Sequence, residues 1–73
     1  MVVVAKYEVE AVVIDAKGNN KFIVELVDVG LSVNAHLSGK LITRRIRIEK
    51  GSRVMVALDA YDTSNGIITK RLD

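Results

Sequence analysis

The chain has 73 residues, of which 49% are hydrophobic, and its 11 Lys and Arg against 9 Asp and Glu give a formal net charge of +2. This length predicts one small domain over residues 1–73, with enough apolar residues to fill a single core. The absence of cysteine excludes disulfides and thiolate metal sites. The first apolar run stops at Lys6, too short to span a membrane, so we expect a cytoplasmic protein without membrane association.

Alternation of apolar and polar residues predicts strands in the first half of the chain. The first expected strand covers residues 7–14, and a turn at 17–20 leads to a second strand at 21–27. In the second strand Phe22 shares a face with Val24 and Leu26, which predicts a core position for its ring. The third expected strand, residues 31–37, has two faces: Leu31, Val33 and Ala35 inward, and Ser32, Asn34 and His36 outward.

The second half of the chain begins with an interruption of the strand pattern. Residues 40–44 predict a short helical turn, and residues 45–48 an extended segment with Arg45 and Arg47 on one side and Ile46 and Ile48 toward the core. A fourth strand is expected at 53–58 and a last strand at 67–72. Between them, Asn65-Gly66 predicts a polar turn over residues 61–66.

Five short strands without a long helix predict an all-β fold. The single interruption, between strands 3 and 4, favours a five-stranded Greek-key barrel of the OB type, with a short helical turn at that point, over a sandwich.

Positive charge is concentrated in residues 40–53. That segment holds six of the eleven Lys and Arg and one acid, a net +5, and the rest of the chain carries −3. Neutralisation of phosphates supplies most non-specific affinity for nucleic acids, so the segment predicts a nucleic-acid interface. The alternative interpretation is a solvated charged loop.

Other chemistry is sparse. His36 is the only histidine, so no metal site is expected, and it is either an RNA contact or a partly packed surface residue. Glu8 and Glu10 indicate a solvated strand face rather than a catalytic pair. Tyr61 is either a packed corner tyrosine or a surface contact. We expect no enzymatic activity and no cofactor.

Several segments, in their order and spacing, resemble the bacterial translation initiation factor 1 family, within the wider S1-like group of RNA-binding barrels. The resemblance covers about residues 6–71, and the segments that carry it are Phe22-Ile23-Val24-Glu25-Leu26, Ala35-His36-Leu37-Ser38-Gly39-Lys40, Ile46-Arg47-Ile48, Gly51-Ser52-Arg53-Val54 and Tyr61-Asp62-Thr63-Ser64-Asn65-Gly66.

The resemblance implies a protein that binds the aminoacyl-tRNA site of the small ribosomal subunit, contacts its ribosomal RNA and works with other initiation factors, without catalysing a reaction. It also implies an RNA-contacting loop with support from the last strand. Together with His36 and Tyr61, the candidate RNA-binding residues are Ser38, Gly39, Lys40, Arg44, Arg45, Arg47, Lys70 and Arg71.

The chain also departs from the family pattern. Ala11 replaces a usual glycine, and the turn at 28–30 is one residue longer. Arg45, Lys70, Ile23 and Ile67 differ in chemical type from the usual residues, and Asp73 adds an acid. The alternative hypothesis is therefore a divergent or engineered OB barrel, acting as a general RNA-binding module or self-associating through apolar strand surfaces, whereas the family resemblance predicts a monomer.

Overall fold

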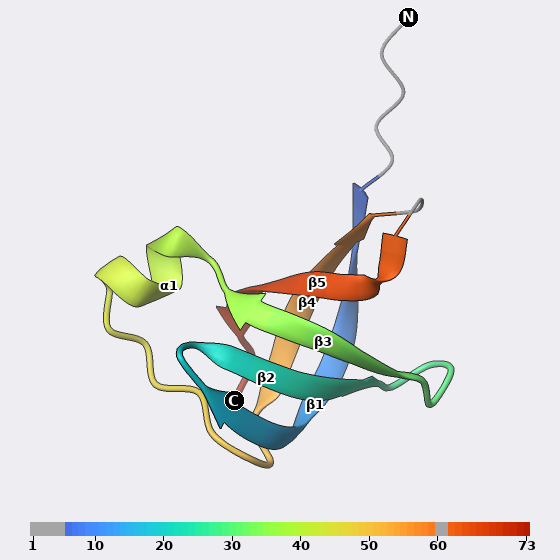
Figure 1. Cartoon of the computed structure of the whole chain (residues 1–73), viewed down its shortest axis with the longest axis horizontal. Helices are drawn as coiled ribbons and strands as arrows, with labels where there is room; N and C mark the ends of the chain where they lie inside the picture. The colour runs from blue at the N-terminus through green and yellow to red at the C-terminus, as the bar shows by residue number, and fades with distance from the viewer. Residues whose placement is uncertain (1–5, 60–61) are drawn as a thin grey trace, which may run out of the picture.

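The computed structural model describes residues 6–59 and 62–73. This part of the chain contains five strands and one short helix: β1 (Lys6–Gly18), β2 (Lys21–Leu26), β3 (Ser32–Leu37), α1 (Gly39–Thr43), β4 (Arg53–Asp59) and β5 (Asp62–Arg71). The strands form a closed barrel in the order β1-β2-β3-β5-β4 (Figure 1). The predicted all-β OB-type barrel, with its helical turn between strands 3 and 4, is confirmed.

Closure depends on one parallel pairing. Neighbouring strands pair antiparallel except β3 and β5, which run parallel with Asn34 opposite Asn65 and Leu37 opposite Ile68. Because β4 lies between β3 and β5 in the chain, this pairing is the crossover that closes the barrel.

The core fills the barrel with side chains from alternating strand positions. The alternation predicted for β2 and β4 is confirmed, and Phe22 is buried as expected. Branched aliphatic residues suit a narrow interior of this kind. The fully buried members with the largest side chains are Val13, Val24, Val54, Val56, Leu58 and Ile68.

Strand β1 is longer than predicted because its hairpin turn is tight. The turn consists of Asn19 and Asn20, with φ angles of 53° and 61°, which allows a two-residue connection and lets pairing continue to Gly18. A register shift after Val13 bends the strand. Its first half pairs with β4 and its second half with β2, and Ala11 is buried where the two pairings overlap.

The connection between β2 and β3 corrects two expectations. Strand β2 ends at Leu26, and Leu31 is 61% exposed rather than in the core. The Gly30 N–H donates to the Leu26 carbonyl at 2.8 Å, and the Leu26 N–H donates to the Leu31 carbonyl at 2.8 Å. These bonds close the turn, so Leu31 belongs to the turn instead of the strand.

The predicted polar turn at 61–66 is wrong over residues 62–66, which lie in β5, while residue 61 lies outside the described residues. Gly66 is required there for close packing rather than for a turn. A Cβ on Gly66 would lie 2.5 Å from Val56 Cγ1 and 3.0 Å from Leu58 Cδ2. The glycine lets β4 and β5 approach inside the barrel.

Candidate nucleic-acid interface

Helix α1 leads from β3 into the positively charged segment and is fixed at its start. Ser38 is the N-cap residue, and its Oγ accepts a hydrogen bond from the Leu41 N–H at 3.4 Å. The Ser38 N–H donates to the Ile68 carbonyl of β5 at 3.0 Å. Leu41 is the buried residue of the helix, so Ser38 and Leu41 together attach α1 to the barrel.

The end of α1 is a Schellman motif centred on Arg45. Arg45 has a φ of 55°, its N–H donates to the Ile42 carbonyl at 3.1 Å, and the Ile46 N–H donates to the Leu41 carbonyl at 3.0 Å. The extended run predicted for residues 45–48 is therefore wrong at Arg45, because the chain must reverse to end the helix. Ile46 and Ile48 do pack against the core, as expected.

Residues 46–52 have no helix or strand, yet their backbone is held to the barrel. The Arg71 guanidinium Nη1 donates to the Arg47 carbonyl at 2.7 Å. The Gly51 N–H donates to the Val13 carbonyl at 2.8 Å, and the Val13 N–H donates to the Ser52 carbonyl at 2.9 Å. The bend in β1 thus supplies the polar groups that hold the far end of this segment.

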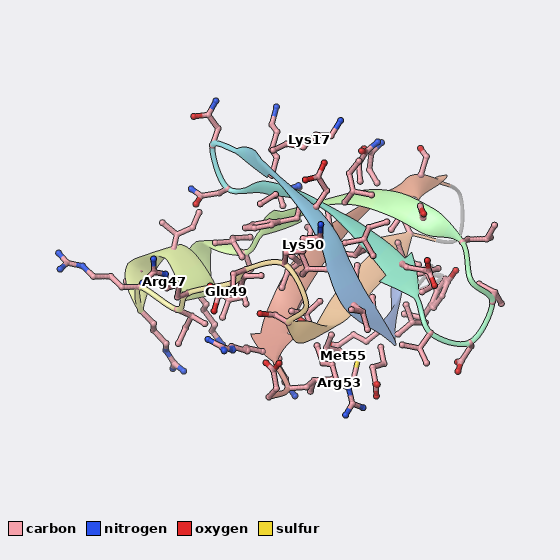
Figure 2. All side chains as sticks on the ribbon, turned by 90° about the horizontal axis from the view of Figure 1, so that it is seen from below. Lys17, Arg47, Glu49, Lys50, Arg53 and Met55 are labelled. Carbon is pink, nitrogen blue, oxygen red and sulfur yellow. The ribbon has the colours of Figure 1, made fainter. Side chains whose placement is uncertain are left out.

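We call residues 40–50 the basic loop. Its cations are exposed, and within residues 6–59 and 62–73 their side chains form no hydrogen bond or ion pair. Figure 2 shows Arg47 extending from the loop near α1. The cations of the basic loop, all available to a ligand, are Lys40, Arg44, Arg45, Arg47 and Lys50.

Arg53 follows the basic loop in sequence but lies in β4 and has a different role. It forms an ion pair with Glu10 of β1, and its Nε donates to Glu10 Oε2 at 3.1 Å. The hydrogen bond and the attraction of Glu10 raise the pKa of Arg53. This pair links β1 to β4 and shows that Glu10 belongs to a charged strand surface.

A hollow of about 370 Å³ lies between the basic loop and the turn from β1 to β2. Its floor is mostly apolar, and Arg45 and Arg47 stand at its edge together with Asn20. The turn from β1 to β2 therefore lies close to Arg45 and Arg47 of the basic loop. The sequence pattern does not predict this proximity.

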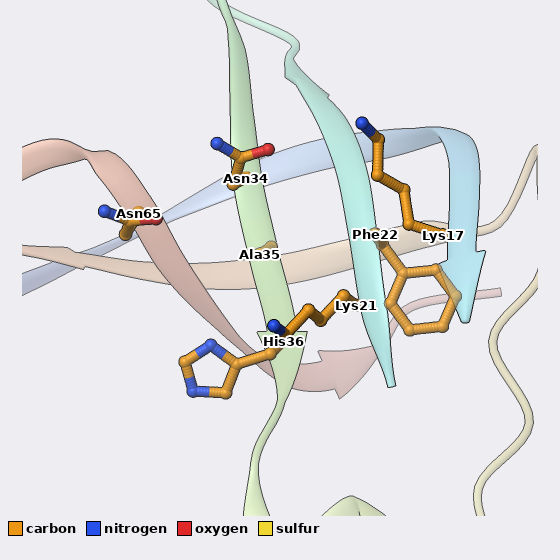
Figure 3. Close-up of a pocket in the computed structure, with 7 residues that line it drawn as sticks. All are labelled: Lys17, Lys21, Phe22, Asn34, Ala35, His36 and Asn65. Atoms are coloured by element: carbon orange, nitrogen blue, oxygen red, sulfur yellow. The ribbon is translucent and has the colours of Figure 1, made fainter. Parts of the chain in front are cut away.

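A second hollow, of about 280 Å³, lies on the outer face of β2, β3 and β5 (Figure 3). His36 is exposed there, opposite Lys21 on β2, and Asn34 lies opposite Asn65 on β5. Lys17 also lines this hollow. The alternation of the third strand predicts the outward positions of Asn34 and His36, whereas no sequence motif marks Lys17, Lys21, Asn34 or Asn65 as site residues.

The remaining candidate residues lie outside residues 40–50, the basic loop. Lys70 is exposed and lies opposite Met55 of β4. Arg71 is joined to the loop by its hydrogen bond to the Arg47 carbonyl. Tyr61 lies outside the described residues. Gly39 is the first residue of α1 and is exposed.

The described residues offer neither a metal site nor a membrane-spanning helix. They contain no group of three or more His, Asp or Glu side chains placed to hold a metal ion. The one helix among them, α1, lacks the length and apolar content needed to cross a membrane.

A closed five-stranded barrel with a fixed loop of exposed cations defines a small RNA-binding protein of the OB class. The sequence model of the family described as translation initiation factor 1A / IF-1 matches residues 1–73, and the chain belongs to this family. The predicted family is therefore confirmed, and with it a role in translation initiation.

Two solved structures are similar to this one. The solution structure of translation initiation factor 1 from the Wolbachia endosymbiont strain TRS of Brugia malayi is 35% identical, with 94% of this chain and 80% of that chain covered and a TM-score of 0.76. The crystal structure of YjeQ from Thermotoga maritima is 24% identical, with 92% of this chain and 23% of that chain covered and a TM-score of 0.75. The second likeness is one of fold alone.

Proposed function

We propose that this protein binds small-subunit ribosomal RNA at the aminoacyl-tRNA site of the small ribosomal subunit during initiation, in the cytoplasm and together with other initiation factors. Family membership supports the initiation role. The observation that carries the RNA contact is the basic loop, whose backbone is hydrogen-bonded to the barrel while the side chains of Arg44, Arg45 and Arg47 have no hydrogen-bond or ion-pair partner among the described residues.

A fixed loop suits RNA binding for an energetic reason. Ordering a flexible segment opposes association, so a loop that is already held binds with a smaller loss of conformational entropy. Arginine is well matched to phosphate, because its planar guanidinium can donate two parallel hydrogen bonds. The arginines of the loop therefore contact backbone phosphates in this proposal.

The outer face of β2, β3 and β5 supplies a second kind of contact. Asparagine amides both donate and accept hydrogen bonds, which suits ribose hydroxyls and base edges exposed in the shallow minor groove of RNA. Asn34, Asn65 and His36 line this face, and Lys17 and Lys21 add positive charge. RNA is recognised by shape and charge, and the protein acts by binding alone, without a cofactor.

The double variant Arg44→Gln/Arg47→Gln tests the phosphate contacts. It removes two cations, so the slope of log affinity against log salt concentration should fall by about 2, with weaker binding at every salt concentration. The measurement is fluorescence anisotropy of labelled protein titrated with bacterial small ribosomal subunits.

The variant Val29→Glu/Leu31→Glu is the matched control, because it changes net charge by the same amount on exposed residues of the turn from β2 to β3, away from the basic loop. Its salt slope should equal that of the wild-type protein. Equal losses in both double variants would mean that net charge alone governs binding and that the basic loop is not the site.

Self-association is a second candidate function, favoured by an exposed apolar cluster at the turn from β2 to β3. Val27, Val29 and Leu31 are 51%, 62% and 61% exposed. If these residues join two copies, the mass measured by light scattering rises with protein concentration and Val29→Glu prevents the rise. A constant monomer mass over the same range would remove this candidate.

A further inference from the structure

Residues 72–73 lie against the beginning of β4, and Asp73 also accepts a hydrogen bond from the side chain of Arg71. The Leu72 N–H donates to the Arg53 carbonyl at 2.8 Å, and the Arg53 N–H donates to Asp73 Oδ2 at 3.2 Å. The other oxygen, Asp73 Oδ1, accepts from Arg71 Nε at 3.0 Å. One carboxylate thereby connects the start of β4 with the end of β5.

Arg71 extends this connection to the basic loop. While its Nε is held by Asp73, its Nη1 donates to the Arg47 carbonyl at 2.7 Å. The guanidinium is planar, so a carboxylate that fixes Nε also fixes the direction of Nη1. The hydrogen bonds from Arg71 and from the Arg53 backbone lower the pKa of Asp73 and so favour its charged form.

We propose that Asp73 is a positioning residue for RNA binding, which holds the basic loop in its binding conformation through Arg71. This inference rests on the proposed function. The change in charge and the release of the loop have opposite effects on RNA binding when Asp73 is removed. Loss of an acid by itself should strengthen binding to phosphates. Release of the loop weakens binding, because the loop must then be ordered by the RNA.

The test compares Asp73→Asn with Asp28→Asn, which has the same change in charge. Asp28 is exposed in the turn from β2 to β3, at the end of the molecule away from α1 (Figure 1). We expect Asp28→Asn to bind bacterial small ribosomal subunits as tightly as wild type or up to about twofold tighter. Asp73→Asn should bind roughly three- to tenfold more weakly.

Three further variants distinguish positioning from a direct contact. If Asp73 acts only through Arg71, Arg71→Gln and Arg71→Gln/Asp73→Asn bind equally weakly, because the second change removes nothing further. Asp73→Glu, which keeps the carboxylate, should recover part of the affinity. Additive losses in the double variant would contradict an action through Arg71.

Backbone ¹⁵N relaxation gives a readout that does not depend on RNA. Residues 46–49 should become more mobile on the nanosecond timescale in Asp73→Asn and remain as in wild type in Asp28→Asn. Binding of Asp73→Asn as tight as that of Asp28→Asn, with residues 46–49 still ordered, would overturn the inference. If wild type itself fails to bind, the proposed function fails, and the relaxation comparison still decides whether Asp73 holds the loop.

Discussion

Arg45 shows how one backbone conformation determines where an arginine is presented. Its φ of 55° lies in the left-handed region, which costs about 1–2 kcal/mol for residues other than glycine. The chain accepts this cost at the end of α1, where reversal brings Ile46 and Ile48 to the core and leaves the guanidinium of Arg45 at the edge of a hollow.

Substitution by glycine at two adjacent positions tests this conformation. Arg45→Gly should raise the free energy of unfolding by about 0.5–1 kcal/mol, because glycine adopts the left-handed region without steric cost. Arg44→Gly should lower it by about 1 kcal/mol, because Arg44 has helical angles of φ −81° and ψ −2°. Urea denaturation measures both, and losses of equal size would contradict the left-handed conformation of Arg45.

Asp73 predicts a pH dependence of stability with a definite sign. Its pKa in the folded protein is lowered below the ordinary value of 3.8, mainly by the hydrogen bond from Arg71. A lowered folded-state pKa means that the stabilisation is fully present above the unfolded-state pKa and is lost as pH falls through the folded-state pKa.

The difference in unfolding free energy between wild type and Asp73→Asn should therefore be constant from neutral pH down to about pH 4 and shrink below it. Urea denaturation at a series of pH values measures this difference, with Asp28→Asn as the control for net charge. A difference that grows as pH falls would contradict the ion pair with Arg71.

At the scale of elements, β5 depends on the absence of a side chain at Gly66. Gly66→Ala should lower the free energy of unfolding by about 1–3 kcal/mol, because the new methyl group would overlap Val56 in a closely packed barrel. Gly39→Ala is the matched control, since a Cβ at the first residue of α1 meets nothing within 4 Å. Equal stabilities of the two variants by urea denaturation would mean that β4 and β5 do not approach as described.

The elements that alternation predicted well are those with one buried and one exposed face. Strands β2 and β4 lie within one residue of their expected bounds, and α1 lies within one residue of the expected helical turn. Asn65-Gly66 misled the prediction because the same dipeptide suits a tight turn and a close strand contact, and only the position of Val56 in space distinguishes the two. Leu31 misled it because an apolar side chain is also found in exposed turns.

At the scale of the whole molecule, the barrel places the basic loop and the exposed apolar cluster of the turn from β2 to β3 at opposite ends. The basic loop and α1 lie at one end, and the turn with Val27, Val29 and Leu31 lies at the other (Figure 1). The basic loop was evident from sequence, because its arginines are close together in the chain. The face of His36 is assembled only by strand pairing: β2 brings Lys21 opposite His36, closure of β5 onto β3 brings Asn65 opposite Asn34, and Lys17 of β1 lines the same hollow.

Competition on the small ribosomal subunit tests the proposed function most directly. Labelled protein is titrated with bacterial small ribosomal subunits, and the complex is then challenged with an unlabelled initiation factor of the same family. We expect saturable binding that the competitor displaces completely and that weakens steeply with salt. Weak binding that the competitor leaves unchanged would contradict the aminoacyl-tRNA site as the place where this protein acts.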